Sequence, residues 1–433
     1  MKSLTQRLDL LDQAVQKKTK QTLGNLIFWC TFLLLLVIHC IENTSVISSG
    51  AGWLRPLYLF RNFLYLVMIV KTLFFARYRT HELIGVLFLY LMGTLSFLCS
   101  RDFSLMECAI VAVGAKDVLP KQLAVVFGTV KAASIPITLF LYALGVLPEL
   151  IYDNGWGEIY NTYGFCHRNV LGVNIACLCL VWFCLRFRRM NLLDALLWGF
   201  FAFGSYYLTY SKTSILIMGV IVVGAYIFRS VEEYLYRIPH FDWILCGLVL
   251  LLLAVSFLGT VLFEEGNAFW ELVDDIFTKR FRFANQCFES YGITLFGQRL
   301  PFVSTLQSQY TGIDRLILDN SYMRVLLYNG LLPGITFLLV YLYALKKTCE
   351  RRDGALLFGL LIMALYGMSE RFMLDINYNV PLLAASVCCF YRIKKKKPTN
   401  KRRQRVESDY KMPLAHACDL YRLCAAWIQS KRR

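Results

Sequence analysis

The sequence predicts an all-α polytopic membrane protein, and three features of its composition support this. Hydrophobic residues make up 57% of the 433 residues, while charged residues make up only 17%. The mean hydropathy is +0.51, and the apolar residues are gathered into long runs. Aromatic residues, at 15%, suit a chain that meets two bilayer interfaces. These values exclude a soluble multidomain protein, a collagen-like or disordered chain and a small disulfide-stabilised fold.

Twelve segments fit the template of a bilayer span, which needs about 20 apolar residues, or fewer where other helices shelter it. The fourth and eleventh are short, and we expect them to be re-entrant or tilted. The first is not a cleavable signal peptide, because no small-residue cleavage site follows it. In chain order the segments are Gly24–Cys40, Trp53–Phe75, Leu83–Leu98, Phe103–Ala115, Leu123–Leu147, Val170–Leu185, Leu192–Leu208, Thr213–Phe228, Trp243–Phe263, Ser321–Leu345, Gly354–Tyr366 and Asn377–Tyr391.

The basic residues indicate how these segments are oriented. With both termini placed in the cytoplasm, most of the 46 Lys and Arg residues fall in the cytoplasmic connections and tail. This is the positive-inside pattern, so the net charge of +17 reflects topology and anionic lipid, and no nucleic-acid partner is required. Other cations fall inside predicted spans, where charge is costly, and those of the second span are expected to face a cavity or a headgroup. They are Arg55, Arg61, Lys71, Lys131 and Arg324.

This topology divides the chain into five regions. The large loop is expected to contain short helices over the bundle, because a structureless loop of that length is unusual. The regions are a cytoplasmic amphipathic N-terminus (1–23), the first nine spans (24–263), one large extracytoplasmic loop (264–320), the last three spans (321–391) and a basic cytoplasmic tail (392–433).

Both ends of the chain carry apolar residues at helical spacing beside basic clusters. They recur from Leu4 to Val15 ahead of Lys17, and from Leu414 to Ile428 behind the Lys394–Arg405 cluster. We expect both segments to be helices lying on the inner leaflet. A tail that binds a partner protein is the alternative.

The 15 cysteines indicate no disulfide framework and no metal site. Most lie inside apolar runs, and no CxxC pair with metal-ligand spacing occurs. A free cysteine in an apolar segment usually packs as a small hydrophobe. We therefore predict neither a metal nor any other cofactor.

Four extracytoplasmic places bring charged side chains together in this topology. They are Tyr163–Asn169 before the sixth span, the turn Tyr210–Thr213, the pair Glu370–Arg371 and the arginines of the large loop. Such a cluster suits a diphosphate, because a guanidinium holds two phosphate oxygens at once. Fixed cations would also stabilise a departing pyrophosphate without a metal. An acceptor hydroxyl would need a base, for which His167, Glu370 and Asp319 are candidates.

Each of these signals also has a simpler interpretation. The His167–Arg168 pair could anchor a helix at the headgroups, and Lys212 could extend its amine to the interface. Arg280 and Arg282 could instead pair with Asp274–Asp275 on a solvated face. The convergence on one membrane face favours a binding site over these separate roles.

Four short sequence segments between Gly164 and Gly330 occur in the same order as the motifs of a known family. Gly164 to Gly172 reads GFCHRNVLG, and Thr209 to Thr213 reads TYSKT. Ile293 to Gly297 reads ITLFG, and Leu318 to Tyr322 reads LDNSY, with Gly330 following. In this order they resemble the GF-x-HPN-x-xG, T-x-SRT, lfG and DN-x-yl…l…G motifs of the O-antigen polymerase (Wzy) and O-antigen ligase superfamily. The resemblance covers the chain from about Gly164 to Gly330, and the topology is similar too.

The chain departs from the family pattern at two positions. Arg168 stands where the family usually has proline, and Lys212 where it usually has arginine. Lysine neutralises a phosphate but lacks the planar fork of arginine. The ligase branch typically carries a functional histidine in the large loop, and this loop has none, which favours a polymerase. The histidines of the chain are His39, His81, His167, His240 and His416.

The resemblance implies a glycosyltransferase of the cell membrane whose active site faces outward. Such an enzyme joins undecaprenyl-diphosphate-linked oligosaccharide repeat units into O-antigen, capsule or exopolysaccharide. Its fold is a helical bundle of the lipid-phospho-sugar glycosyltransferase type, without a metal. Implied partners are the lipid-linked glycans, membrane lipids, and a chain-length regulator and flippase of the same pathway. The alternatives are a ligase that transfers glycan to a lipid or wall acceptor, and a flippase for lipid-linked oligosaccharides.

The candidate site residues combine this resemblance with the charge cluster. Arg168, Lys212 and the two loop arginines would hold the diphosphate, and His167 or Glu370 would assist proton transfer. The candidate catalytic residues are His167, Arg280, Arg282 and Glu370. The candidate substrate-binding residues are Arg168, Asn169, Ser211, Lys212, Arg299, Asp319, Asn320 and Arg371.

Overall fold

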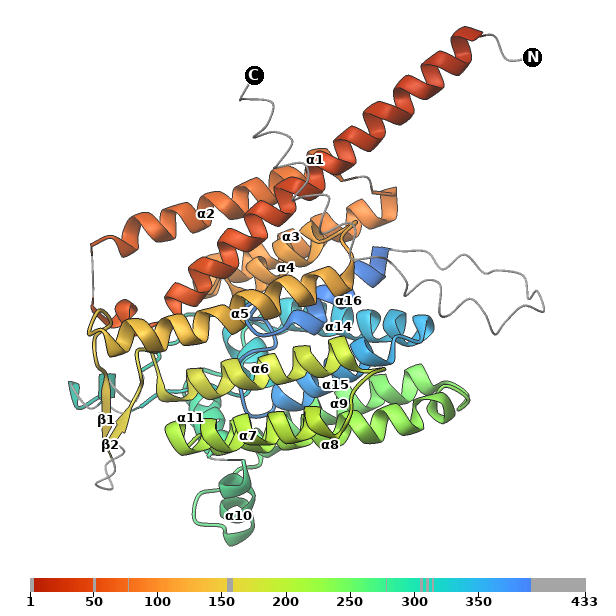
Figure 1. The fold of residues 1–433 in the computed structure, drawn as a ribbon. Coiled ribbons are helices and arrows are strands. Elements are labelled where there is room, and N and C mark those ends of the chain that lie inside the picture. Colours follow the sequence, from red (N-terminus) through yellow and green to blue (C-terminus); the bar gives the residue numbers. More distant parts are fainter. Residues whose placement is uncertain are drawn as a thin grey trace. The chain divides into compact units, whose positions relative to one another are not determined.

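A computed structural model describes residues 4–49, 52–76, 78–153, 159–277, 279–303, 307–308, 311–313 and 315–390. These residues form a helical bundle with one short hairpin (Figure 1). The predicted basic tail, with its Lys394–Arg405 cluster and amphipathic helix, lies outside the described residues. Apart from this hairpin, the described residues confirm the expected helical fold.

The helices alternate in direction along most of the chain, so that successive connections fall at opposite ends of the bundle (Figure 1). The α-helices are α1 Leu4–Glu42, α2 Leu54–Val70, α3 Thr80–Ser100, α4 Ser104–Gly114, α5 Pro120–Ala143, α6 Arg168–Arg186, α7 Leu192–Thr209, α8 Lys212–Leu235, α9 Phe241–Val261, α10 Ala268–Ile276, α11 Arg280–Tyr291, α13 Ser321–Arg324, α14 Leu331–Arg351, α15 Gly354–Tyr366 and α16 Val380–Phe390. The other elements are the 3₁₀-helix η1 Ser45–Ser49, the π-helices η2 Lys71–Phe75 and η3 Val325–Asn329, and the strands β1 Ile151–Asp153 and β2 Ile159–Asn161.

Among the described residues, nine helices are long and apolar enough to cross a membrane. The sequence predicted twelve spans, and the other three correspond to the short helices α4, α15 and α16. The longest of these has 13 residues. At about 1.5 Å per residue it extends about 20 Å, less than a hydrocarbon core of about 30 Å. The twelve apolar segments are therefore found, but three of them are too short to cross a bilayer on their own.

The short helices α15 and α16 are surrounded by longer ones. Every residue of α16 from Val380 to Cys388 is buried, and the helix packs against α4, α5, α14 and α15. Helix α7 shows the opposite pattern, with Leu192, Phe200 and Tyr207 more than two-thirds exposed. Large exposed apolar side chains on a long helix suit contact with lipid, whereas a fully buried short helix meets only protein. The bundle therefore has a protein-lined centre at α15 and α16.

The N-terminal region differs from its expected division. Residues 1–23 were expected to form a surface helix separate from the first span, but α1 runs without a break from Leu4 to Glu42. The residues around Lys17–Lys20 are good helix formers, and nothing in this stretch terminates a helix. Contact of its first turns with the inner leaflet stays a prediction.

The large loop contains the short helices expected of it. Helix α10 exposes Phe269 and Leu272, whereas α11 buries Phe281, Ala284 and Cys287 and packs against α9 and η3. The loop therefore includes one helix that is part of the packed bundle and one that is largely exposed.

The tenth predicted span, Ser321–Leu345, is wrong as a single helix. It is divided into α13, η3 and α14, and the division falls at Gly330, which has φ 98°. A Cβ atom on Gly330 would lie 2.1 Å from the backbone nitrogen of Gly297, so the two glycine backbones touch. This close approach joins the large loop to the start of α14, and only glycine fits it.

We predict that Gly330→Ala lowers the apparent unfolding temperature of the detergent-solubilised protein by several degrees. The methyl group must displace the backbone at Gly297 and the residue must keep its positive φ, at a combined cost of about 2–5 kcal/mol. The matched control is Gly145→Ala, where φ is 71° and a Cβ atom meets nothing within 4 Å. Only a backbone cost of about 1–2 kcal/mol remains there. Equal losses in both variants would refute the contact with Gly297.

Candidate functional site

Three segments distant in the sequence meet at one buried guanidinium. Arg280, the first residue of α11, pairs with the Asp319 carboxylate, and its Nη2 lies 3.3 Å from Glu370 Oε1. The side chains of Arg280 and Glu370 are only 11% and 6% exposed. One cation therefore serves two carboxylates, and the three residues form the centre of the candidate site.

The turn before α11 places Arg280. Asp274 at the end of α10 is buried, and its Oδ1 accepts hydrogen bonds from the backbone N–H groups of Phe281 and Arg282, at 3.0 and 3.2 Å. It thereby caps the first turn of α11, as an acidic side chain at a helix N-terminus commonly does. The cap fixes the direction in which α11 starts and so the position of its first side chain.

Ser321 joins the segment that carries Asp319 to the one that carries Glu370. Its backbone N–H donates to the carbonyl of Gly367 at 2.7 Å, and its hydroxyl donates to the carbonyl of Glu370. The hydroxyl also accepts from the N–H of Met373 at 3.2 Å. The neighbouring Asn320 is buried and caps α13 through the N–H groups after it. Asp319 and Glu370 are therefore held beside each other by backbone contacts as well as by Arg280.

His167 is the N-cap of α6 and belongs to the same group of charges. Its Nδ1 accepts a hydrogen bond from the Asn169 N–H at 3.2 Å. Burial lowers the pKa of His167 to about 4, with Asp319 opposing this and Arg168, Arg371 and Arg280 reinforcing it. The ring is therefore neutral at pH 7, and because Nδ1 accepts, the proton lies on Nε2. In this form His167 is a hydrogen-bond donor at Nε2.

Glu370 is the site residue that titrates near neutrality. Burial raises the pKa of Glu370 to about 7, opposed by Arg280 and reinforced by Asp319. Burial also lowers the pKa of Arg280, but Asp319 and Glu370 outweigh this and raise it. A carboxylate poised near pH 7 suits a general base, because it is then both deprotonated and able to take up a proton.

Two further arginines, Arg371 and Arg324, interact electrostatically with Asp319. Arg371 is exposed, so a ligand can reach it, and the neighbouring Asp319 and Asp375 raise its pKa. Arg324 interacts electrostatically with Arg371 and Asp319. It lies 3.8 Å from Asp102 and stacks on the rings of Phe302 and Tyr328. The site thus gathers more cations than the sequence motifs indicated.

Arg324 was not predicted as a site residue, because it falls inside an apolar segment read as a span. An arginine in such a segment is costly in lipid and so indicates a polar surrounding. That signal was present in the sequence but did not identify the partner, since Asp102 is far away in the chain.

Several predicted site residues lie apart from this centre. Arg282 pairs with Glu265 at 3.4 Å and Asp274 at 3.6 Å, so it stabilises the loop and does not reach the Arg280 carboxylates. Residues two apart on a helix point about 200° away from each other, which explains the separation. Arg299 is exposed, and no ion pair is found for it within the described residues.

The residues of the first two sequence motifs pack against each other through α6 and α8. A Cβ atom on Gly172 would lie 2.8 Å from the Ser214 hydroxyl, so the helices approach closely. Ser211 is buried, with its Oγ 2.9 Å from Ser214 Oγ, whereas Lys212 is exposed on α8. Arg168 stacks on the Tyr160 ring of the β1–β2 hairpin at 4.2 Å. Ser211 therefore has a packing role, and Lys212 stays a separate surface cation.

Within the described residues, no group of three or more His, Cys, Asp or Glu side chains is placed to hold a metal ion. The chemistry open to the site is the binding of an anion by arginines beside a titratable carboxylate. No family model, curated protein or solved structure matches this chain.

We predict a pH-dependent stability that Glu370→Gln removes. Because the pKa of Glu370 rises from 4.5 to about 7 on folding, the folded state binds more protons between these pH values. Its contribution is therefore full below about pH 4.5 and is lost as the pH rises to about 7. His167 acts in the opposite sense between about pH 4 and 6.5, because its pKa falls on folding.

The test compares apparent unfolding temperatures of the wild type and Glu370→Gln from pH 4.5 to 8. The wild type should lose stability relative to Glu370→Gln as the pH rises from 4.5 toward 7, because only the wild type gives up a proton at this position, and the His167 effect cancels. A difference that is constant across this range would contradict the raised pKa of Glu370.

Proposed function

We propose that the protein is a membrane glycosyltransferase that polymerises lipid-diphosphate-linked oligosaccharide repeat units. The observation that carries the proposal is the buried guanidinium of Arg280 between Asp319 and Glu370, with Arg371 and His167 beside them. Such a centre can hold a diphosphate and accept a proton within one small volume. The resemblance to O-antigen polymerases supports the same conclusion, because His167 and Asp319 belong to two of its motifs.

In the proposed reaction, the donor is a growing glycan on undecaprenyl diphosphate, bound from the outer side of the cell membrane. The diphosphate competes with Asp319 and Glu370 for Arg280 and also engages Arg371. Arg168 and the Nε2–H of His167 are further donors at the same place. The diphosphate and Glu370 share the cations Arg280 and Arg371, both of which lower the pKa of Glu370, so its carboxylate can face the acceptor.

The chemical step is a displacement at the anomeric carbon. The acceptor hydroxyl oxygen forms the new glycosidic bond, and the bond from the anomeric carbon to the diphosphate oxygen breaks. Glu370 takes up the hydroxyl proton, and undecaprenyl diphosphate leaves with the bonding electron pair. The arginines stabilise the negative charge that accumulates on the leaving group. His167 is the less suitable base, since its Nδ1 already accepts a hydrogen bond and its Nε2 carries the proton.

The first test deletes the gene in its host and separates the lipid-linked and surface glycans by size. Single repeat units on the carrier lipid, with no long polymer, support a polymerase. Long polymer that stays on its carrier would indicate a ligase instead. Single units retained on the cytoplasmic face would indicate a flippase.

We predict that Arg280→Lys reduces polymer formation by about 100-fold or more, the scale expected when one fixed donor to developing charge is lost. Lysine keeps the charge but cannot bridge Asp319 and Glu370 with a planar fork. Purified protein with labelled lipid-linked repeat units gives the rate directly. The matched control is Arg282→Lys, which changes a half-buried loop ion pair and should alter the rate by less than about fivefold. Equal effects of the two substitutions would remove Arg280 from its proposed role.

A further inference from the structure

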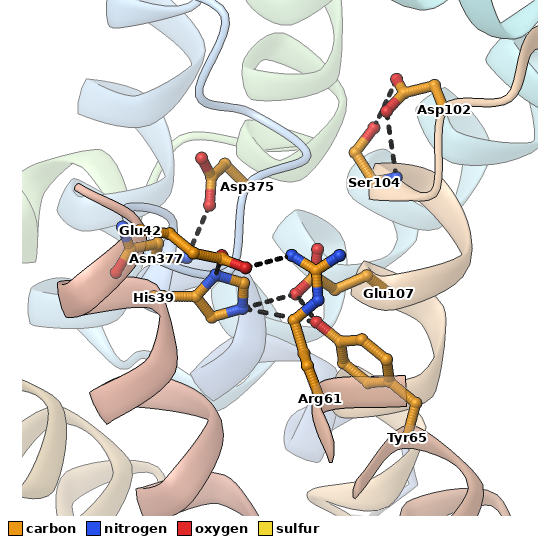
Figure 2. A network of polar contacts seen from close by, with 9 residues as sticks. All are labelled: His39, Glu42, Arg61, Tyr65, Asp102, Ser104, Glu107, Asp375 and Asn377. Atoms are coloured by element: carbon orange, nitrogen blue, oxygen red, sulfur yellow. Dashed lines mark hydrogen bonds and ion pairs between the residues drawn. The ribbon is translucent and has the colours of Figure 1, made fainter. Parts of the chain in front are cut away.

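A second polar network lies at the same end of the bundle and involves three helices (Figure 2). His39 and Glu42 come from α1, Arg61 and Tyr65 from α2, and Glu107 from the first turn of α4. His39 Nδ1 lies 2.9 Å from Glu42, and Nε2 lies 2.6 Å from Glu107. Arg61 pairs with Glu42, and the Tyr65 hydroxyl donates to Glu107. No motif in the sequence indicated this group.

The geometry fixes the charge of the network. A carboxylate oxygen only accepts hydrogen bonds, and both nitrogens of His39 face carboxylates, so both must carry protons. His39 is therefore an imidazolium. With Arg61 it supplies two positive charges to match the two negative charges of Glu42 and Glu107. The side chains of His39, Glu42 and Glu107 are at most 13% exposed, so this balance is what allows the group to be buried.

The network is joined to the segment before His167 by backbone hydrogen bonds. Directly after Glu42, the carbonyl of Asn43 accepts from the N–H of Cys166 at 2.9 Å. The N–H of Ser45 donates to the carbonyl of Gly164 at 2.8 Å. The end of α1 thus pairs with the three residues that precede His167, and any movement of this end moves them.

The network also faces the loop that carries Glu370 and Arg371. Asp375 in this loop interacts electrostatically with His39 and Glu107, and Figure 2 shows it beside the His39–Glu42 pair. The carboxylate of Asp375 accepts from the N–H of Asn377 at 2.8 Å, which holds it in the turn before α16. The negative charge of Asp375 also raises the pKa of Arg371, four residues earlier in the chain. The network is therefore linked by hydrogen bonds through Asn43 to one segment of the candidate site and interacts electrostatically with the other through Asp375.

We propose that the network of His39, Glu42, Arg61 and Glu107 is a positioning unit that holds the segments carrying His167 and Arg371 in their places. Its residues do not touch the substrate. They act through Asn43 on one side and Asp375 on the other. Any effect of the network on polymer formation rests on the proposed function. Its role in holding these two segments does not, and that role can be measured without an assay of polymer formation.

The reporter is the thiol of Cys166, which is bonded to Asn43 through its backbone and precedes His167. Burial raises the pKa of Cys166 to about 11, so its reaction with a maleimide is slow in the intact protein. The experiment treats purified full-length protein with a maleimide and measures labelling of each cysteine by peptide mass spectrometry. Cys287, buried in α11, reports general unfolding in the same sample.

His39→Gln leaves two carboxylates with one cation, and should raise the labelling rate of Cys166 by about 5- to 30-fold while Cys287 is unchanged. Glu107→Gln, with the opposite imbalance, should do the same. The double variant restores neutrality with Arg61 and Glu42, so its labelling rate should return most of the way to that of the wild type. The matched control, His240→Gln, changes an exposed histidine outside the network and should have no effect.

Unchanged labelling of Cys166 in both single variants would overturn the proposal. So would a parallel rise at Cys166 and Cys287, which indicates loss of the fold as a whole, or a double variant no better than its parents. Polymer assays on the same samples separate this proposal from the function. If the labelling follows the expected pattern but the wild type forms no polymer, the positioning stands and the proposed function fails.

Discussion

The sharing of one guanidinium by two carboxylates is the constraint on which the candidate site depends. The Arg280 and Glu370 side chains are only 11% and 6% exposed and Asp319 is 21% exposed, so water compensates these charges only in part. Asp319 and Glu370 reach it from two other segments, and the hydrogen bonds of Ser321 hold those segments together. Burial, reinforced by the neighbouring Asp319, drives the Glu370 carboxyl group toward its protonated form.

The apolar segments could be predicted from the sequence because hydropathy is a local property. Most helices follow the predicted ranges, and α4 and α15 fall where short segments were expected, whereas α16 was predicted as a full span and is shorter. The break at Gly330 could not be predicted, because it depends on contact with Gly297 across the large loop. Likewise, the sequence did not distinguish Arg280 from Arg282 as candidate catalytic residues. The cap that Asp274 makes on α11 decides which of them faces the bundle and which faces the loop.

The cations of the second predicted span were expected to face a cavity or a headgroup, but two of them meet protein groups: Arg61 pairs with Glu42, and Lys71 donates to the carbonyl of Gly114. Arg61 meets Glu42 from α1, and Arg324 meets Asp102 from the start of α4. Those pairings depend on how helices are arranged, which no single segment specifies. His39 was treated only as one histidine among others, since its role appears only when Glu42 and Glu107 approach it from two sides. The charged groups at this end of the bundle form one continuous system, and the sequence reveals only some of its members.

The shortness of α15 and α16 bears on the order in which the protein is made. Helices α15 and α16, with 13 and 11 residues, are too short to span a bilayer by themselves. They must therefore pack against longer helices that are already inserted. Glu370 and Arg371 lie between them and join the rest of the site last. A nascent chain that ends before Glu370 therefore holds Arg280 without one of its two carboxylates. The site becomes complete only after residues 370 and 371 have been made and their segment has packed beside α13.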